Sequence, residues 1–454
     1  MDRFLKNQAV LAECKIYQML ESHAKEKHVS FHTPGHKMGA WDITELSFSD
    51  NLSCPRGCIA EAEKDIAKIL GAEKSFILTD GSTSGVLSML HAAKTLGVKT
   101  LAVCESSHKS LFNGCVLLGL TPLVHPCEYR EKIPFAHTMY ALNEKYGEIF
   151  AQADALFFTS PDYYGNVADL AAIREYCDAT GKLLIVDGAH GGHLHYDKKL
   201  HAGAYADMWV DGVHKSLPAF TQGAVVSARD EKTAVALGDA VDIFRTTSPS
   251  YPIMASVEYA VKYPRNLALE NAVKVFQQHD RVYQNDDWTK LCVFFGGWAF
   301  DAEKRLESEG IYAEFCDGET LTFYLSPATS EEEFTLLKTR LLQLFEEYPL
   351  SVKKSVQQIP APLILRNKQV EWIALDEAEN RVCAGICGLF PPCVPLFQIG
   401  EIITKDKIEK MQKANNVFGL KDGKILTFQE ENLLPLRAVM VAEKVRSFAC
   451  LANI

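Results

Sequence analysis

The sequence lacks an apolar run long enough to cross a membrane, and its N-terminus lacks the apolar core and small-residue cleavage site of a secretory signal. It also lacks an excess of positive charge. The formal net charge is -11 at pH 7 and the pI is about 5.7, which argues against a general nucleic-acid or anionic-membrane binder. These absences predict a soluble, cytoplasmic protein whose partner is a small molecule.

Zinc-knuckle spacing is also missing. The 13 cysteines are odd in number and lie mostly in apolar stretches, as buried reduced thiols do. Cys54 and Cys58 are four positions apart, and so are Cys383 and Cys387, whereas a zinc knuckle has a two-residue gap. We therefore expect neither a disulfide framework nor a structural metal.

What is present is a chain of 454 residues, 47% of them hydrophobic, enough for a sizeable core. From about residue 60 to 230, strand-like apolar runs alternate with helical ones, which indicates a doubly wound, mainly parallel sheet. Residues 1 to about 28 are expected to form one amphipathic helix. The predicted domains are an N-terminal helix and loop segment (1–45), a major domain (46–290) and a C-terminal α+β domain (291–454).

The C-terminal domain is predicted to be smaller and built differently. We expect a helix near 301–309 and strands at 311–316 and 320–326. Ser330 and Glu333 have the spacing of a capping box, so another helix is expected to start there.

Polar signals follow the predicted strands of the major domain at 80–85, 106–109, 160–166 and 187–190. Ligands of such sheets bind beyond the carboxyl ends of the strands. Three His-Lys pairs occur in the chain, and any one of them is by default a solvated loop. Lys215 differs because it lies in a short loop between apolar segments, where a lysine loses its charge readily and a neutral amine can attack an aldehyde.

Two further signals accompany Lys215. Asp187 closes the apolar run 183–187, where a carboxylate would keep the pyridine nitrogen of a cofactor protonated; a helix cap or a loop aspartate is the alternative. Gly81 to Gly85 form a Gly/Ser loop that opens a helix, the arrangement of a phosphate cradle. A lone loop of this kind is weak evidence, and the three signals together are much stronger.

The segment 190–195, HGGHLH, offers a competing interpretation as a metal cluster. Glycines between the histidines disfavour a rigid shared face, and no carboxylate lies nearby in sequence. We therefore favour a role for His190 beside a cofactor and expect no metal.

Taken together, these motifs resemble the Orn/Lys/Arg decarboxylase family, over nearly the whole chain. The similarity is greatest to the short forms typical of Gram-positive bacteria. The motifs are FHTPGHKMG (31–39), DGSTSG (80–85), SSHKSLFNG (106–114), SPDYYGN (160–166), VDGAHGGH (186–193), VHKSLPAFTQGA (213–224) and TTSPSYPIMAS (246–256).

The resemblance implies pyridoxal 5'-phosphate (PLP) as cofactor, a fold type I (aspartate-aminotransferase-like) major domain and a homodimer or higher homo-oligomer. It implies decarboxylation of an amino acid, most typically arginine, lysine or ornithine; another PLP reaction and a PLP-binding protein without catalysis are the alternatives. The implied site residues are the Schiff-base lysine Lys215 with its neighbour His214, Asp187 at the pyridinium nitrogen, His108 stacked on the ring, Ser82, Thr83 and Ser84 at the phosphate, His190 on the substrate side, and Thr247 and Ser248 at the partner subunit's phosphate.

The chain also departs from the family pattern. Gly212 stands where the family has a serine, so we expect weaker PLP binding and tighter binding in Gly212→Ser. The alternative is that the glycine has a positive φ and that another hydroxyl or an ordered water already fills the gap. Glu105 and Ser106 replace an Arg-Asn pair. Cys393 interrupts a Tyr-Pro-Pro-Gly-Ile-Pro motif, and Ile399 replaces a proline. These changes affect the expected phosphate affinity and substrate choice rather than the core chemistry.

Overall fold

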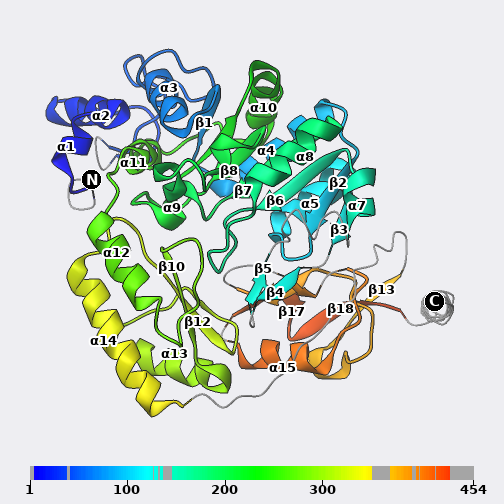
Figure 1. Cartoon of the computed structure of the whole chain (residues 1–454). Coiled ribbons are helices and arrows are strands. Elements are labelled where there is room, and N and C mark those ends of the chain that lie inside the picture. Colours follow the sequence, from blue (N-terminus) through cyan, green and yellow to red (C-terminus); the bar gives the residue numbers. More distant parts are fainter. Residues whose placement is uncertain are drawn as a thin grey trace.

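The computed structural model describes residues 5–37, 41–125, 127–130, 133–135, 146–349, 369–390, 395–397, 399–414 and 416–429. Figure 1 shows a large sheet with helices around it, and smaller sheets and helices below it that come from the later part of the chain. Within the described ranges, no helix has both the length and the apolar character that a bilayer crossing requires.

The large sheet has seven strands in the order β1-β9-β8-β7-β6-β2-β3 (Figure 1). Neighbouring strands from β8 to β3 are parallel, whereas β9 runs antiparallel to both β8 and β1. The predicted mainly parallel, doubly wound sheet is therefore confirmed. Its strands are β1 (Lys74–Leu78), β2 (Thr100–Cys104), β3 (Thr121–His125), β6 (Ala155–Thr159), β7 (Leu183–Gly188), β8 (Met208–Asp211) and β9 (Ala224–Ala228).

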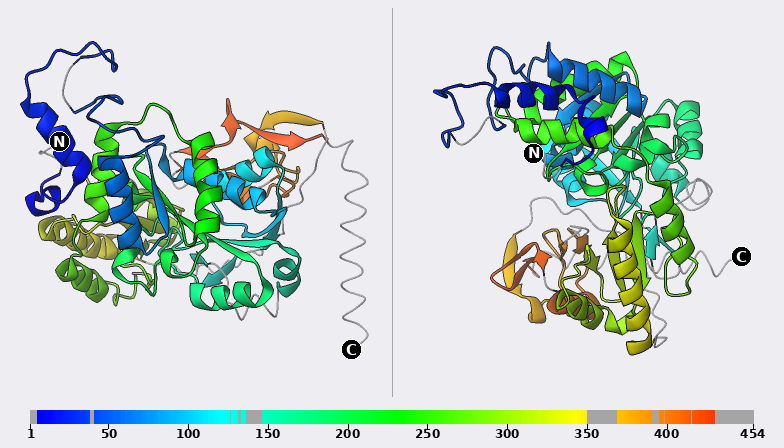
Figure 2. Two further views of the ribbon diagram at one scale, coloured as in Figure 1. Left: turned by 90° about the horizontal axis from the view of Figure 1, so that it is seen from above. Right: turned by 90° about the vertical axis from the view of Figure 1, so that its left-hand side faces the viewer.

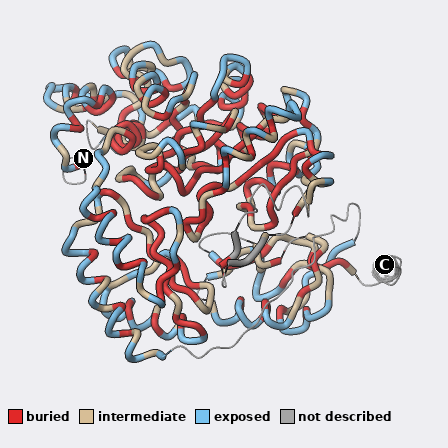
Figure 3. Tube along the Cα trace, viewed as in Figure 1, coloured by how far each residue is buried: buried red, intermediate tan, exposed pale blue. Residues whose placement is uncertain are grey.

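Both faces of this sheet are buried, as the red strands between paler helices in Figure 3 show. Along β6, Leu156 and Phe158 join one apolar core, and Ala155 and Phe157 join the other. This alternation is what a strand with a period of two residues produces when both faces are covered. Helices α3 (Cys58–Leu70), α8 (Leu170–Thr180) and α11 (Tyr251–Val261) contribute to the first core, and α4 (Gly81–Thr95), α5 (Lys109–Leu118) and α10 (Glu231–Phe244) to the second.

The N-terminal segment is two helices, α1 (Gln8–Leu11) and α2 (Lys15–Lys25), so the prediction of one helix over residues 1–28 was wrong. The break has a tertiary cause. Glu258 of α11 is fully buried, and its carboxylate accepts hydrogen bonds from Lys15 N at 2.7 Å and Ile16 N at 2.9 Å. It therefore caps the start of α2. Figure 2 shows the blue N-terminal helices against green α11.

The next part of the chain forms a three-stranded sheet in the order β10-β12-β11. Its strands are β10 (Lys290–Phe294), β11 (Phe315–Cys316) and β12 (Thr320–Tyr324), and its helices are α12 (Leu267–Phe276), α13 (Ala299–Glu307) and α14 (Glu331–Glu347). The expected capping box is present: Ser330 Oγ accepts from Glu333 N, and the Glu333 carboxylate accepts from Ser330 N. The boundary predicted between residues 290 and 291 falls one residue into β10; the three-domain division stays a prediction.

The remaining described elements are short. Figure 1 shows most of them grouped below the large sheet, on the side of β4 and β5. They are β4 (Glu128–Arg130), β5 (Ile133–Phe135), α7 (Gly147–Gln152), β13 (Val370–Ala374), β14 (Cys387–Leu389), β15 (Pro395–Phe397), α15 (Lys405–Lys413), β16 (Val417–Phe418), β17 (Leu420–Lys421) and β18 (Lys424–Phe428).

Candidate active site

Lys215 lies directly beyond the carboxyl end of β8, in the one-turn helix α9 (Val213–Ser216). The loop is held by His214, whose backbone N and ring Nδ1 donate to the Gly223 carbonyl at 3.1 and 2.8 Å. Lys215 Nζ lies 3.1 Å from His190 Nε2. The lysine and this imidazole therefore point into the same space.

That space is a cavity of about 160 Å³ at the carboxyl ends of the parallel strands, where ligands of doubly wound sheets bind. It brings together most of the residues that the sequence singled out. Ser84, Thr247 and Ser248 are the predicted residues that do not line it. The lining consists of Gly81, Ser82, Thr83, Val86, His108, Ser110, Thr159, Tyr163, Asp187, Ala189, His190, His214, Lys215, Thr221 and Gln222.

Asp187 lies at one side of the cavity near the end of β7 and is buried. Its Oδ1 accepts a hydrogen bond from Ala189 N at 3.1 Å. Burial raises the pKa of this carboxyl, and the nearby Lys215 cation partly offsets that effect. A buried carboxyl of this kind has a strong tendency to pair with a protonated ring nitrogen, because the pair relieves the cost of burying its charge.

The start of α4 forms the opposite side. Gly81 has a φ of +78°, a conformation that favours glycine, and its N–H donates to the Gln222 carbonyl at 2.9 Å. No side chain caps this helix, so its first N–H groups are left for a ligand beside the cavity that Ser82 and Thr83 line. A helix N-terminus with hydroxyls around it binds a phosphate well.

Three predicted phosphate ligands lie elsewhere. Ser84 is buried, and its hydroxyl donates to the Gly81 carbonyl at 2.9 Å, so it stabilises the turn from within. Thr247 and Ser248 are exposed on the loop after α10. Thr246 N on the same loop donates to Asp80 Oδ2 at 3.0 Å, which ties that loop to the residue before α4.

His108 is the N-cap residue of α5, and its Nδ1 accepts from Ser110 N at 3.2 Å. The Ser110 hydroxyl lies 2.8 Å from the same nitrogen. Burial, followed by the positive charges of Lys215 and Lys109, lowers the pKa of His108 to about 3. The imidazole is therefore neutral at physiological pH and available to stack on a planar ring.

His190 is enclosed by aromatic rings. The ring centroids of Tyr163 and Tyr324 lie 4.7 and 5.5 Å from it, both edge-on. Burial, and after it the charges of Lys215 and Lys290, hold the pKa of His190 well below its usual value. Its Nδ1 has no hydrogen-bond partner among the residues that the structure describes, whereas Nε2 faces Lys215.

Sequence reasoning missed several lining residues, notably Thr159, Tyr163, Thr221 and Gln222. Three of them, Tyr163, Thr221 and Gln222, could have been found from the sequence, because they lie in motifs that follow predicted strands. Thr159 gave none: it is a strand residue whose buried hydroxyl has no protein partner within the described ranges. Such a hydroxyl beside a cavity is a candidate ligand contact.

Comparison with known proteins decides the family. Residues 40–294 match the family model described as Orn/Lys/Arg decarboxylase, major domain. The arginine decarboxylase of Bacillus subtilis is 28% identical over 88% of this chain and 93% of its own length. The chain belongs to the Orn/Lys/Arg decarboxylase family. It is therefore a PLP-dependent amino-acid decarboxylase.

Solved structures agree on the fold. The constitutive lysine decarboxylase of E. coli has a TM-score of 0.68 at 20% identity, covering 92% of this chain and 82% of that one. A structure titled SPT with PLP has a TM-score of 0.53 at 12% identity, covering 76% and 85% of the two chains. The fold type I architecture predicted from the sequence is thereby confirmed.

The residues present fit the family's cofactor. The cavity holds an amine for the aldehyde (Lys215), a buried carboxyl for the ring nitrogen (Asp187) and a neutral imidazole for the ring face (His108). The uncapped N-terminus of α4, with the Ser82 and Thr83 hydroxyls, supplies donors for the phosphate end. Each polar part of PLP thus meets a group of matching chemistry.

Two departures from the family pattern have structural explanations. Gly212 has a φ of -81°, so the positive-φ alternative is wrong. A Cβ there would nevertheless lie 2.4 Å from the Ala189 carbonyl oxygen, so the chain has no room for the family's serine, which argues against tighter PLP binding in Gly212→Ser. Glu105 accepts from Cys127 N at 2.9 Å and does not line the cavity. The departure at Cys393 lies outside the described residues.

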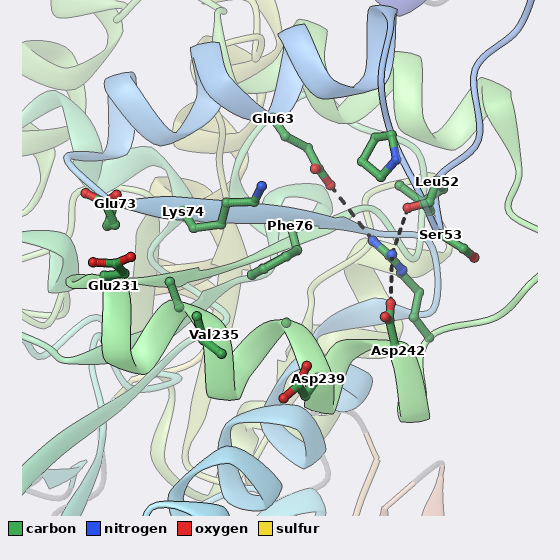
Figure 4. Close-up of a pocket in the computed structure, with 14 residues that line it drawn as sticks. Leu52, Ser53, Glu63, Glu73, Lys74, Phe76, Glu231, Val235, Asp239 and Asp242 are labelled. Carbon is green, nitrogen blue, oxygen red and sulfur yellow. Dashed lines mark hydrogen bonds and ion pairs between the residues drawn. The ribbon is translucent and has the colours of Figure 1, made fainter.

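A second and larger cavity, of about 480 Å³, lies between α3, β1 and α10 (Figure 4). None of the predicted site residues lines it. Its Arg245 is occupied, donating to the Leu52 carbonyl at 2.8 Å and lying 3.9 Å from Glu63 and 3.6 Å from Asp242. Its Lys74 is exposed at the start of β1. This cavity has no lysine suited to an aldehyde, so size alone would point to the wrong site.

The histidines of HGGHLH diverge. His190 faces Lys215, His193 Nε2 lies 2.8 Å from the Asp287 carboxylate, and His195 Nδ1 donates to the Gly192 carbonyl at 2.7 Å. In the described part of the chain, no group of three or more His, Cys, Asp or Glu side chains is placed to hold a metal ion.

Proposed function

We propose that this chain decarboxylates a basic amino acid (arginine, lysine or ornithine) to the corresponding amine and CO2, with Lys215 as the cofactor lysine. One observation carries the proposal. Lys215 Nζ lies 3.1 Å from a neutral, buried His190 in a cavity that also contains Asp187 and the start of α4. The names of the relatives, arginine and lysine decarboxylases, support a basic substrate.

The proposed roles follow from the geometry. Lys215 would bind the cofactor's aldehyde, Asp187 its ring nitrogen, and Ser82 and Thr83 its phosphate. When bound, PLP supplies an electron sink for the pair of electrons that remains at Cα when CO2 leaves. Asp187 makes the sink effective by stabilising positive charge on the ring nitrogen, and His108 fixes the plane of the ring.

Proton transfer falls to Lys215 and His190. His190 Nε2 accepts a hydrogen bond from an N–H of Lys215 Nζ, so the neutral imidazole orients the amine. We propose that the proton that returns to Cα is delivered from Lys215 Nζ. Tyr163 and Tyr324 cover the imidazole and keep water from it.

We also propose a cytoplasmic homodimer with shared sites. Thr247 and Ser248 are exposed and do not line the cavity of their own chain. Exposed hydroxyls at this position support a contact with the partner subunit's phosphate, as the family resemblance implies.

The test combines trapping with product analysis. Purified protein with PLP is reduced with borohydride, digested and mapped; the cofactor is expected on Lys215, and Lys215→Ala is expected to yield no trapped peptide. Separate reactions with arginine, lysine and ornithine are then assayed for CO2 and amine. A 2-oxo acid product would indicate transamination instead, and trapped cofactor without turnover of any of the three would contradict a basic substrate.

A further inference from the structure

A buried charged cluster lies behind the candidate site, outside the cavity. It consists of His193, Asp287 and Lys290, whose side chains are almost completely buried. Asp287 accepts from His193 Nε2 at 2.8 Å and pairs with Lys290 Nζ at 2.9 Å. The two partners hold the pKa of Asp287 below its usual value despite burial. The carboxyl is therefore ionised, and the cluster contains a true buried ion pair.

This cluster clamps both loops that carry the proton-transfer pair. Lys290 Nζ donates to the His190 carbonyl at 2.7 Å and to Thr289 Oγ1 at 2.9 Å. His193 N donates to the hydroxyl of Ser216, the residue next to Lys215, at 3.3 Å. The Lys290 side chain thus fixes the backbone of His190, and the backbone N–H of His193, whose ring belongs to the cluster, holds the helix of Lys215.

The clamp comes from the smaller sheet. Lys290 opens β10, and its register partner on β12 is Tyr324. The Tyr324 ring lies 5.1 Å from Lys290 Nζ and 5.5 Å from the His190 ring. An ammonium over a ring face is attracted to it, and more strongly where water is excluded. Two adjacent strands of the smaller sheet therefore reach His190 from its buried side.

We propose that Lys290 is a positioning residue: its buried ammonium anchors the His190 carbonyl and thereby sets the geometry and protonation of the His190–Lys215 pair. The inference rests on Lys215 being the cofactor lysine. A buried ion pair is a poor source of stability, because desolvation offsets the attraction between its charges. A hydrophobic residue at position 290 could pack equally well. We therefore attribute the role of the cation to its electrostatic effect on His190 and to its hydrogen bond with the His190 carbonyl.

The field has a definite sign. A cation behind His190 disfavours protonation of the imidazole and of the nitrogen of Lys215. The other titratable or charged groups that act on Lys215 or His190 belong to several elements and stay unchanged in the variants below. They are Asp187, His108, His214 and Glu314.

The test is Lys290→Met in the PLP-loaded protein, read by the pH dependence of the cofactor's visible absorbance. That band reports protonation of the nitrogen that joins the cofactor to Lys215. Loss of a nearby cation should move the midpoint upward by roughly one to two pH units, as expected for unit charges about 6–12 Å apart at an effective dielectric constant of about 20. Lys290→Arg retains the cation and should keep the midpoint close to that of the wild type.

Lys262→Met is the matched control. Lys262 also has a largely enclosed side chain, 8% exposed, which is bonded to the Glu13 carbonyl, Asp65 and Glu258, all outside the cavity. Its loss should lower stability without moving the midpoint. Lys290→Met leaves the buried Asp287 carboxylate without its cation. The double variant Lys290→Met/Asp287→Asn therefore provides a second test, because it removes both charges. Its midpoint should move in the same direction by less, since the lysine and not the aspartate contacts His190.

The outcomes separate this inference from the proposed function. If borohydride does not trap PLP on Lys215 of the wild type, the proposed function fails. If trapping succeeds, the midpoint of Lys290→Met is compared with those of the wild type and Lys262→Met; the double variant replaces Lys290→Met if the single variant does not fold. Equal midpoints would show that Lys290 is only structural and that the inference is wrong. An upward shift of the midpoint in Lys290→Met that is absent in Lys290→Arg supports the inference.

Discussion

A side chain at position 212 would clash with the backbone next to Asp187, the carboxyl that we propose binds the cofactor's ring nitrogen. A Cβ there would lie 2.4 Å from the Ala189 carbonyl oxygen and 3.1 Å from its carbon, both rigid backbone atoms. Ala189 N donates to Asp187 Oδ1 at 3.1 Å, and Ala189 precedes His190. A shift of Ala189 would therefore disturb two groups that face the cofactor.

The cost can be sized from the overlap. Forcing extra atoms into a packed interior typically costs about 1–3 kcal/mol. If the strain is present only when PLP is bound, the PLP affinity of Gly212→Ser should drop roughly five- to 150-fold. A new hydroxyl could offset part of this by bonding the phosphate, worth about 1.5–3 kcal/mol, only if Ala189 yields without strain.

The assay is a spectroscopic titration of apo-protein with PLP. Gly212→Ala adds the same Cβ without a hydroxyl, so it should weaken binding about as much as Gly212→Ser. Gly297→Ser is the second control, because nothing lies within 4 Å of a Cβ built there; its affinity should match that of the wild type. Tighter binding by Gly212→Ser than by the wild type would refute the steric argument.

Three further predictions concern the same site. Asp187→Asn should retain the fold but lose at least a hundredfold in kcat, more than about 2.7 kcal/mol, because an amide cannot stabilise a protonated ring nitrogen; a loss under tenfold would contradict this role. The pKa of His108 is about 3 in the folded chain, against 6.5 for an unperturbed histidine. The free energy of unfolding should therefore fall by about 1.4 kcal/mol as pH falls from 7.5 to 5.5, because only the unfolded chain takes up a proton there. His108→Gln should remove that part of the acid sensitivity, measured by urea titrations of apo-protein. Mixed chains of Lys215→Ala and Ser248→Ala should regain activity if Ser248→Ala alone is inactive; no recovery after verified subunit exchange would argue against a shared site.

The sequence predicted those site residues whose signal is local. Asp187 follows a continuous apolar run, and such runs become strands buried on both faces, which places a polar residue at the ligand-binding edge of the sheet. Gly81 to Thr83 follow β1 in the same way. Ser84 shows the limit of this reasoning. In the first turn of a helix, successive residues point in different directions, so its hydroxyl turns back to Gly81 while Ser82 and Thr83 line the cavity.

Features that depend on distant partners were not predictable. The split between α1 and α2 depends on Glu258, a residue more than two hundred positions away. The partner of His193 was equally unpredictable: no carboxylate lies near His193 in sequence, yet Asp287 contacts it through the fold. Spacing along the chain reports local periodicity, whereas burial of a charge is decided by whichever element packs against it.

Lys290 shows why the proposed site is larger than its motifs. His190 belongs to the loop after β7 and Lys215 to the helix after β8, but the group that fixes the His190 carbonyl comes from β10, outside the large sheet. Tyr324, on the neighbouring strand, covers the same imidazole. The smaller sheet therefore acts on the proton-transfer pair through one hydrogen bond and one ring contact. A change in how that sheet packs would alter His190 before it altered any residue that the motifs mark.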